Sequence, residues 1–487
     1  MNKHTKIIAT VGPSSQDTET LERMIRAGVD LFRLNFSHGD HAYHAQSLTN
    51  IKEAARRTGR HIGVLQDISG PKVRIGDLAG NIRLAEGDTI ECVREELVGD
   101  FVAPGRLRVS LNYPEIIGKV EVGDPIYLYD GIIRAQVVEK GEGFFRAEVL
   151  TGGILSPRKG VNFPHTRLAI DILTPKDIDD IRWGVENGVD FMAISFVQSA
   201  DDMLRARNIV REFGGAVSLI AKIEKFEALE RFDAILEASD GVMVARGDLG
   251  IEVPYYKVPE IQKSLIKQCN QAAKPVITAT QMLLSMTRAD RATRAEISDV
   301  ANAVLDGSDA LMLSEESAIG DYPVEAVETM SNTIKEAEGF YDYARIGKLP
   351  YRDEMDVIDE SAVNLVQHMD LDAILSITTS GGSAGKISRY RSSRPIYAIT
   401  HDEAILRKLT LVWGVRPLFT IPSGKHLHGT IATAIAEGIR RNVLDPSGGY
   451  VLTAGDHAGK SGTTNTIKIL RQTEMRYYLQ EHDRQHT

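Results

Sequence analysis

Eight short, almost uninterrupted apolar runs constrain the fold of this chain more than any other feature. Continuous apolar runs are typical of parallel strands covered on both faces, whereas half-exposed strands alternate between apolar and polar residues. Amphipathic helical stretches separate most of the runs, which indicates repeated strand–helix units. The runs are Thr5–Gly12, Leu31–Phe36, Ile62–Ile68, Phe191–Phe196, Ser218–Glu224, Val242–Gly247, Pro275–Thr280 and Ala310–Ser314.

A recurring turn supports one repeated unit. Gly28-Val-Asp30, Gly188-Val-Asp190 and Gly307-Ser-Asp309 each lie between a helical stretch and the next apolar run. Glycine suits the left-handed conformation in which many helices end. Eight strand–helix units predict an α/β fold of the (β/α)8 TIM-barrel type, in which the chemistry lies at the carboxyl ends of the strands.

Two regions do not fit the barrel. The long connection after the third run has short alternating segments with Gly-Asp turns, which predict an inserted β-rich domain able to act as a lid. Beyond about Tyr343, strands and helices alternate again and predict a separate C-terminal α/β domain. The expected boundaries are 1–70 and 167–343 for the barrel, 71–166 for the lid and 344–487 for the C-terminal domain.

Composition excludes several classes of protein. The net charge is −10 with acidic and basic residues interspersed, so no basic face for nucleic acid is expected. No apolar run approaches the roughly 18 residues of a membrane span. The first run starts at Thr5, which leaves no room for a signal peptide. Cys92 and Cys269 lie far apart, so we expect buried thiols in a reducing cytoplasm.

Charged and hydroxyl side chains collect where the predicted strands end. Lys222 and Glu224 end one run, and Asp248 follows the next. A lysine beside two carboxylates is costly to bury unless a metal or an anionic ligand joins them. Two carboxylates suit Mg²⁺, and Lys222 with Arg33 can neutralise a transferring phosphoryl group. The pattern favours phosphoryl transfer, although no Walker motif or G-x-G-x-x-G loop is present.

These residues lie in longer stretches that resemble the pyruvate kinase family. The resemblance implies transfer of the phosphoryl group of phosphoenolpyruvate to ADP, giving pyruvate and ATP. It also implies a mobile lid, a regulatory C-terminal domain and a homotetramer. The matching stretches are Thr5–Ser14, Arg33–Gly39, Lys159–Asn162, Ala221–Glu224, Asp240–Gly250, Thr278–Met282, Thr293–Ala303 and Trp413–Val415.

The resemblance also implies a role for each residue of the site. Lys222 would stabilise the transferring phosphoryl group and the enolate, beside Arg33. Glu224 and Asp248 would bind Mg²⁺ or Mn²⁺. The further positions implied in substrate binding and in a proton relay are Ala245, Gly247, Asp248, Thr280 and Ser314. The positions implied at the nucleotide are Pro13, Asn35, His38, Tyr43, Arg74 and Lys159.

One departure from the family pattern concerns potassium. Members that need potassium have Asp-Thr-Lys-Gly-Pro-Glu after the third strand, whereas this chain has Asp67-Ile68-Ser-Gly-Pro-Lys72. Asn35, Ser37 and Asp67 remain as potential ion ligands. The ammonium of Lys72 could supply the missing positive charge, as in a potassium-independent branch of the family. We therefore predict that potassium is not required.

Two further motifs are less specific. Glu315 stands where the family commonly has glycine, and no role is assigned to it. A Ser/Gly-rich loop in the C-terminal domain is similar to the sugar-phosphate effector loop of the family and could cradle phosphate on backbone N–H groups. Its residues are Thr378, Thr379, Ser380, Gly381, Gly382 and Ser383. Because Gly382 has no basic side chain, we expect a monophosphorylated sugar or a nucleotide monophosphate rather than a bisphosphate.

Two alternative functions compete with this interpretation. A metal-dependent aldolase or lyase would share the acidic metal site but would not need a lid carrying Arg74 and Lys159. An inactive effector-binding regulator would have lost catalytic residues, yet Lys222, Arg33 and Thr280 are all present.

Overall fold

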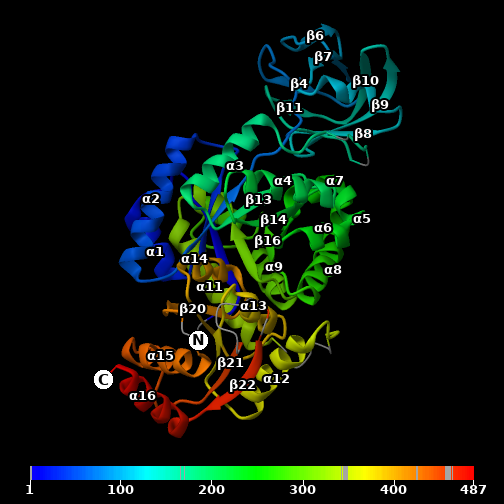
Figure 1. The fold of residues 1–487 in the computed structure, drawn as a ribbon. Helices are drawn as coiled ribbons and strands as arrows, with labels where there is room; N and C mark the ends of the chain where they lie inside the picture. The colour runs from blue at the N-terminus through cyan, green and yellow to red at the C-terminus, as the bar shows by residue number, and fades with distance from the viewer. Residues whose placement is uncertain are drawn as a thin grey trace.

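The computed structural model describes residues 3–164, 166–168, 170–341, 343, 349–423, 426–455, 462 and 464–486. Eight parallel strands close into a barrel in the order β1-β17-β16-β15-β14-β13-β3-β2 (Figure 1). The strands are β1 (Lys6–Thr10), β2 (Leu31–Asn35), β3 (Gly63–Asp67), β13 (Phe191–Ile194), β14 (Ser218–Ile223), β15 (Gly241–Ala245), β16 (Val276–Ala279) and β17 (Ala310–Leu313). They correspond to the eight predicted runs.

Helices cover the outside of the barrel. Thr174 and Thr293 cap two of them through capping boxes, in which the third helical residue, Asp177 or Glu296, hydrogen-bonds back to the cap. The helices are α1 (Thr18–Ala27), α2 (His41–Thr58), α3 (Pro175–Asn187), α4 (Ala200–Glu212), α5 (Phe226–Glu230), α6 (Phe232–Ala238), α7 (Arg246–Glu252), α8 (Val258–Gln271), α9 (Arg294–Leu305), α10 (Glu315–Ala318) and α11 (Pro323–Gly339).

The recurring Gly-x-Asp turns build the amino-terminal end of the barrel. Their glycines have positive φ angles of 132°, 70° and 100°, as a left-handed helix ending requires. The aspartate two residues later accepts a hydrogen bond from a backbone N–H of a neighbouring strand. The pairs are Ile7 N to Asp30 Oδ2 (2.9 Å), Val64 N to Asp190 Oδ2 (3.0 Å) and Val276 N to Asp309 Oδ2 (3.0 Å).

The β-rich insertion leaves the barrel after β3 and returns before α3, so it is attached at the carboxyl ends of the strands (Figure 1). A seven-stranded sheet has the order β12-β8-β9-β10-β5-β7-β6, and β11 pairs with β4. Its own apolar core surrounds Phe145 and Phe163. The strands are β4 (Ile82–Leu84), β5 (Thr89–Val93), β6 (Asp100–Ala103), β7 (Arg106–Ser110), β8 (Pro125–Leu128), β9 (Ile133–Gly141), β10 (Phe144–Thr151), β11 (Gly153–Leu155) and β12 (Val161–Asn162).

The C-terminal α/β domain contains a five-stranded sheet in the order β20-β19-β18-β21-β22. The edge strand β22 is antiparallel and was not predicted from sequence. The strands are β18 (Ala373–Ile377), β19 (Ile396–Thr400), β20 (Val415–Thr420), β21 (Tyr450–Gly455) and β22 (Thr464–Leu470). The helices are α12 (Glu354–His368), α13 (Gly382–Ser388), α14 (Glu403–Lys408), α15 (Leu427–Arg440) and α16 (Gln472–His486). The predicted fold class, a barrel with an inserted β-rich domain and a C-terminal α/β domain, is confirmed.

The C-terminal domain docks on the amino-terminal end of the barrel through the turn aspartates. The buried Arg391 guanidinium donates to Asp309 at 2.9 Å and lies over the Trp413 ring. Arg407 Nε donates to Asp190 Oδ1 at 2.9 Å. These contacts place the C-terminal domain at the end opposite to the lid (Figure 1). Among the described residues, no helix has the length and apolar character of a membrane span.

Candidate active site

An open cavity of about 700 Å³ lies at the carboxyl ends of the barrel strands, between the barrel and the lid residues Lys72 and Asp130. The barrel residues around it come from α7, α9 and α10 and from the segments that follow β16 and β17. They include Arg246, Gly247, Asp248, Thr280, Gln281, Asp299, Ser314, Glu315 and Glu316.

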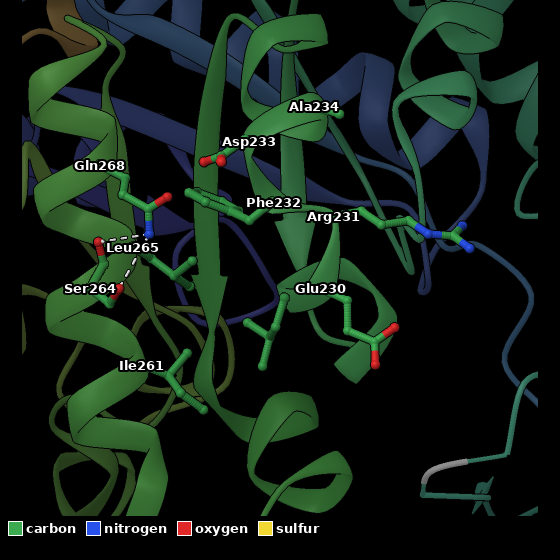
Figure 2. A pocket seen from close by; sticks show the side chains of 10 residues that line it. Glu230, Arg231, Phe232, Asp233, Ala234, Ile261, Ser264, Leu265 and Gln268 are labelled. Atoms are coloured by element: carbon green, nitrogen blue, oxygen red, sulfur yellow. Dashed lines mark hydrogen bonds between the residues drawn. The ribbon is translucent and has the colours of Figure 1, made fainter.

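A second cavity of about 470 Å³ lies on the outside of the barrel between α6 and α8 (Figure 2). Phe232, Ile261 and Leu265 line it with apolar surface. Glu230 and Arg231 extend from its rim, and the Gln268 amide is hydrogen-bonded to Ser264. The residues predicted to carry chemistry do not line this cavity, so the strand-end cavity is the candidate active site.

Lys222, near the end of β14, lies at the centre of a buried network. Its ammonium donates to Ser195 Oγ at 2.7 Å and lies 2.9 Å from Glu224 Oε1 and 3.1 Å from Asp67 Oδ1. Burial alone would lower the pKa of Lys222, but Asp67 and Glu224 raise it above its ordinary value. The side chain is therefore a fixed positive charge, as stabilisation of a transferring phosphoryl group requires.

Arg33 on β2 is held by the same carboxylate. Its Nε donates to Asp67 Oδ2 at 2.7 Å and its Nη1 donates to Thr10 Oγ1 at 3.0 Å. Burial raises the pKa of Asp67, but Lys222 and Arg33 outweigh this and lower it. Asp67 thus orients two cations toward one place, a role that the sequence did not indicate.

Glu224 and Asp248 are the predicted metal ligands. Burial raises the pKa of Glu224; Lys222 opposes this, and the nearby Asp248 carboxylate raises it further. The two carboxylates therefore repel each other, a situation that a bound cation relieves. Phe196 N donates to Glu224 Oε2 at 2.8 Å, whereas no described residue donates to Asp248, which lines the cavity. Two hard oxygen donors, completed by water and substrate phosphate, suit Mg²⁺.

The described residues contain no cluster of three or more histidine, cysteine or acidic side chains that could enclose a metal. A closed protein cage is therefore not present in this part of the chain. A site with two carboxylates leaves coordination positions for the substrate, as is usual for Mg²⁺ in phosphoryl-transfer enzymes.

Thr280 lies in a strained turn after β16. Its φ is 71° and that of Gln281 is 55°, left-handed values that cost energy, particularly for a β-branched residue. Arg246 supports the turn, because its Nη2 donates to Thr280 O at 2.9 Å. The Gly247 N–H, expected at the substrate carboxylate, donates to Thr280 Oγ1 at 2.7 Å. The structure thus brings Thr280 against the backbone after Ala245.

Ser314 follows β17 and lines the same cavity. Its N–H donates to the buried carboxylate of Glu316 at 2.7 Å, and Glu316 also accepts from Leu283 N at 3.0 Å. Glu315, whose role the sequence left open, is exposed and lines the same cavity. Glu316 thus ties the Ser314 backbone to the segment after β16.

The expected nucleotide residues form two groups. Pro13 and His38 are exposed, Asn35 and Tyr43 are half-buried, and all four follow or flank β1 and β2. Arg74 and Lys159 belong to the lid, where Arg74 pairs with Gly160 in an isolated bridge. Arg74 Nη1 donates to Arg158 O at 3.1 Å, and the Lys159 ammonium lies 4.2 Å from the Tyr129 ring centre. The described contacts do not join the lid group to the barrel group.

Lys72 lies at the start of the lid, 36% exposed, with its ammonium 3.7 Å from Asp130 Oδ1. It lines the active-site cavity but makes no described contact with Asn35, Ser37 or Asp67. Asn35 Oδ1 accepts from Ser37 N at 3.2 Å. The Ile68 carbonyl accepts from Ser195 Oγ at 2.6 Å.

The predicted effector loop follows β18 and leads into α13. Gly381 has a φ of 85° and its N–H donates to Thr378 Oγ1 at 3.0 Å. Ser383 Oγ is hydrogen-bonded to Thr464 of β22. Thr379 is half-buried, and Ser380 and Gly382 are exposed. The loop is therefore held by a hydrogen bond within it and by one to β22, at the carboxyl end of β18.

A lidded (β/α)8 barrel with cations and carboxylates at its strand ends defines an enzyme class that acts on small anionic substrates. Comparison with known proteins gives the particular family. The model of the pyruvate kinase barrel domain matches residues 2–327, and that of the pyruvate kinase alpha/beta domain matches residues 356–470. The chain belongs to the pyruvate kinase family.

Individual proteins similar to this chain are also pyruvate kinases. A pyruvate kinase of Geobacillus stearothermophilus is 42% identical over 480 residues, covering 96% of this chain and 80% of the relative. One of Staphylococcus aureus (strain MRSA252) is 41% identical over 479 residues, with the same coverage. The crystal structure of a pyruvate kinase from Cryptosporidium parvum superposes with a TM-score of 0.88 at 36% identity, covering 96% of each chain.

The protein is accordingly a pyruvate kinase, a glycolytic transferase that converts phosphoenolpyruvate and ADP to pyruvate and ATP. The family generally uses a divalent metal. The alternatives of an aldolase or lyase and of an inactive regulator are wrong.

Proposed function

We propose that the strand-end network carries out phosphoryl transfer through the residues assigned from the sequence. The ammonium of Lys222 and the guanidinium of Arg33, both oriented by Asp67, would bind the phosphoryl oxygens and stabilise their charge during transfer. The observation that carries this assignment is the position of Lys222, within 3.1 Å of Glu224, Asp67 and Ser195. Lys222→Met tests it, because this substitution removes the charge while keeping the apolar stem of the side chain.

A divalent ion held by Glu224 and Asp248 would supply Lewis-acid stabilisation of the substrate oxygens. The Gly247 backbone and Thr280 would orient the substrate carboxylate, so that transfer leaves an enolate above the barrel. Thr280 and Ser314 would belong to the relay that brings a proton to the enolate carbon. Pro13, Asn35, His38 and Tyr43 on the barrel, with Arg74 and Lys159 on the lid, would bind ADP.

We also propose that potassium is not required. Of the potential ion ligands Asn35, Ser37 and Asp67, Asp67 has both oxygens engaged by Arg33 and Lys222. The carbonyl of the neighbouring Ile68 accepts from Ser195 Oγ. The ammonium of Lys72 lines the cavity with Asp248 and Thr280, where it supplies a covalently fixed positive charge.

This proposal predicts that activity in a potassium-free buffer with a bulky organic cation equals activity with added potassium, within about twofold. Lys72→Glu should lower kcat in the absence of potassium, because it replaces a cation by an anion beside the phosphates, and added potassium should restore part of the loss. Lys140→Glu is the matched control, because Lys140 also pairs with a lid carboxylate, Glu121, but does not line the cavity. Strong activation of the parent enzyme by potassium would refute the proposal.

We further propose that the loop from Thr378 to Ser383 binds a phosphorylated sugar or a nucleotide monophosphate and regulates activity. Support comes from its hydroxyl groups and backbone, and from the absence of a basic side chain at Gly382, which disfavours a bisphosphate. α13 leads from this loop to the segment of Arg391, which contacts Asp309 just before β17.

A monophosphate ester is therefore expected to shift the half-saturating phosphoenolpyruvate concentration severalfold, and Ser383→Asp should abolish the shift by repelling phosphate. Saturation curves with ribose 5-phosphate, glucose 6-phosphate and AMP measure it, with Ser447→Asp as a control on a distant turn. If none of these esters moves the parent curve, effector binding at the loop is wrong.

A homotetramer follows from resemblance alone, and Mn²⁺ is expected to replace Mg²⁺. Cys92 and Cys269 are buried free thiols, which agrees with a reducing compartment such as the cytoplasm.

A further inference from the structure

A buried ion pair joins two residues that are close in the chain to the proposed metal ligands. Lys225 Nζ donates to Glu252 Oε1 at 2.7 Å, and the two side chains are 12% and 1% exposed. Neither residue has a role in the assignments above. The attraction between two charges is strong where water is largely excluded. Loss of one partner would leave the other as an uncompensated buried charge.

Each partner is covalently close to one metal ligand. Lys225 follows Glu224 directly, at the end of β14. Glu252 is four residues after Asp248 on α7, so both project from the same face of that helix, one turn apart. The ion pair therefore connects the two segments that carry the two carboxylates.

α7 needs such an anchor. It has seven residues and no side-chain N-cap at Ala245, and helices this short are unstable on their own. Its first turn is held by the Gly247 N–H on Thr280 Oγ1. The Lys225–Glu252 pair holds its last residue.

The pair also lies under the lid connection. Lys225 and the lid residue Asn162 line one small cavity with Phe196, whose N–H donates to Glu224. Glu252 Oε2 is buried and has no hydrogen-bond partner in the described part of the chain. The pKa of Glu252 is raised, mainly by burial and also by the nearby Glu227 carboxylate. Lys225 and Asn162 lower the pKa of Glu252 but do not outweigh burial.

We propose that Glu252 is a positioning residue for phosphoryl transfer, which fixes the separation of the Glu224 and Asp248 carboxylates through its ion pair with Lys225. The proposal rests on the assignment of those two carboxylates as metal ligands. Residues that orient metal ligands from behind typically change metal affinity or activity 10- to 100-fold when they are replaced.

Glu252→Gln is expected to weaken Mn²⁺ binding to the substrate-free enzyme and to lower kcat, each about tenfold or more. Lys225→Met should have a larger effect, because Glu252 and Glu227 then face each other without a cation. Lys225→Arg keeps the positive charge and should retain most of the Mn²⁺ affinity and most of the kcat that Lys225→Met loses. Mn²⁺ binding is measured by the electron paramagnetic resonance of the free ion, and thermal unfolding is followed in parallel.

Asp356→Asn is the matched control, since Asp356 also forms a buried ion pair, with Arg389 in the C-terminal domain. It should leave Mn²⁺ binding unchanged. Normal Mn²⁺ affinity and kcat in folded Glu252→Gln and Lys225→Met would overturn the proposal, as would losses explained by the unfolded fraction. Glu224→Gln distinguishes failure of the metal-site assignment from failure of the positioning role of Glu252. If it binds Mn²⁺ normally, the metal-site assignment fails; if it alone loses Mn²⁺, only the positioning role fails.

Discussion

Lys222→Met is expected to lower kcat for ATP formation by about a thousandfold or more. Removal of one preorganised electrostatic donor costs 10²- to 10³-fold in other enzymes, and a cation on a transferring phosphoryl group contributes 10³- to 10⁵-fold. Methionine keeps the length and apolar stem of the side chain but removes the charge. It also leaves Asp67 and Glu224 buried without the ammonium that neutralises them.

Coupled measurement of pyruvate and ATP checks this result. Lys274→Met is the matched control, because this ammonium donates to Leu236 O and Ser239 O at the opposite end of the barrel. The control should lose stability but retain kcat within a few fold. A folded Lys222→Met enzyme with near-parental turnover would show that the charge at the end of β14 does not act on the phosphoryl group.

Glu224→Gln is expected to reduce kcat by at least about a hundredfold and to raise the Mg²⁺ concentration needed for half-maximal activity. The amide keeps the shape of the side chain but loses the negative charge that attracts a divalent ion. Lys222 then loses one of its two buried carboxylate partners. The loss should be partly reversed by high Mg²⁺ if metal affinity is the main defect.

Titration of activity with Mg²⁺ and with Mn²⁺ at saturating phosphoenolpyruvate provides the measurement. Glu437→Gln is a suitable control, because its partners Arg440 and Arg441 lie at the exposed end of α15 in the C-terminal domain. An unchanged Mg²⁺ requirement in Glu224→Gln would exclude the proposed ligand.

Periodicity predicted the barrel well, because each of its strands is buried on both faces and reads as a continuous apolar run. The Gly-x-Asp turns were recognised through glycine, whose backbone conformation is a local property. The edge strand β22 was missed. It begins with three polar residues, Thr464-Asn-Thr466, and Lys468 interrupts its apolar part, so it lacks the continuous apolar signal.

The sequence was less informative about how side chains share partners. The sequence suggested Asp67 as a potential potassium ligand. In the structure it instead orients Arg33 and Lys222, which belong to two different strands. Such a contact depends on barrel closure, which brings together residues far apart in the chain. Arg246 supports the strained Thr280 turn through a contact that also depends on the folded structure. The same is true of Lys72, whose ammonium is directed toward Asp130 of the lid.

The aspartates at the amino-terminal end of the barrel have a consequence for how this chain can be divided. Asp309 accepts from the backbone of β16 and is neutralised by Arg391 from the C-terminal domain. Removal of one partner of a buried ion pair costs about 3–5 kcal/mol, a large part of the 5–15 kcal/mol that holds a typical protein folded. Loss of Arg391 from the full chain would therefore destabilise the barrel, because Asp309 would stay buried without its cation. Truncation after the barrel would instead return Asp309 to water, but it would also remove Leu411, which belongs to the apolar cluster inside the barrel, and so uncover part of the barrel core.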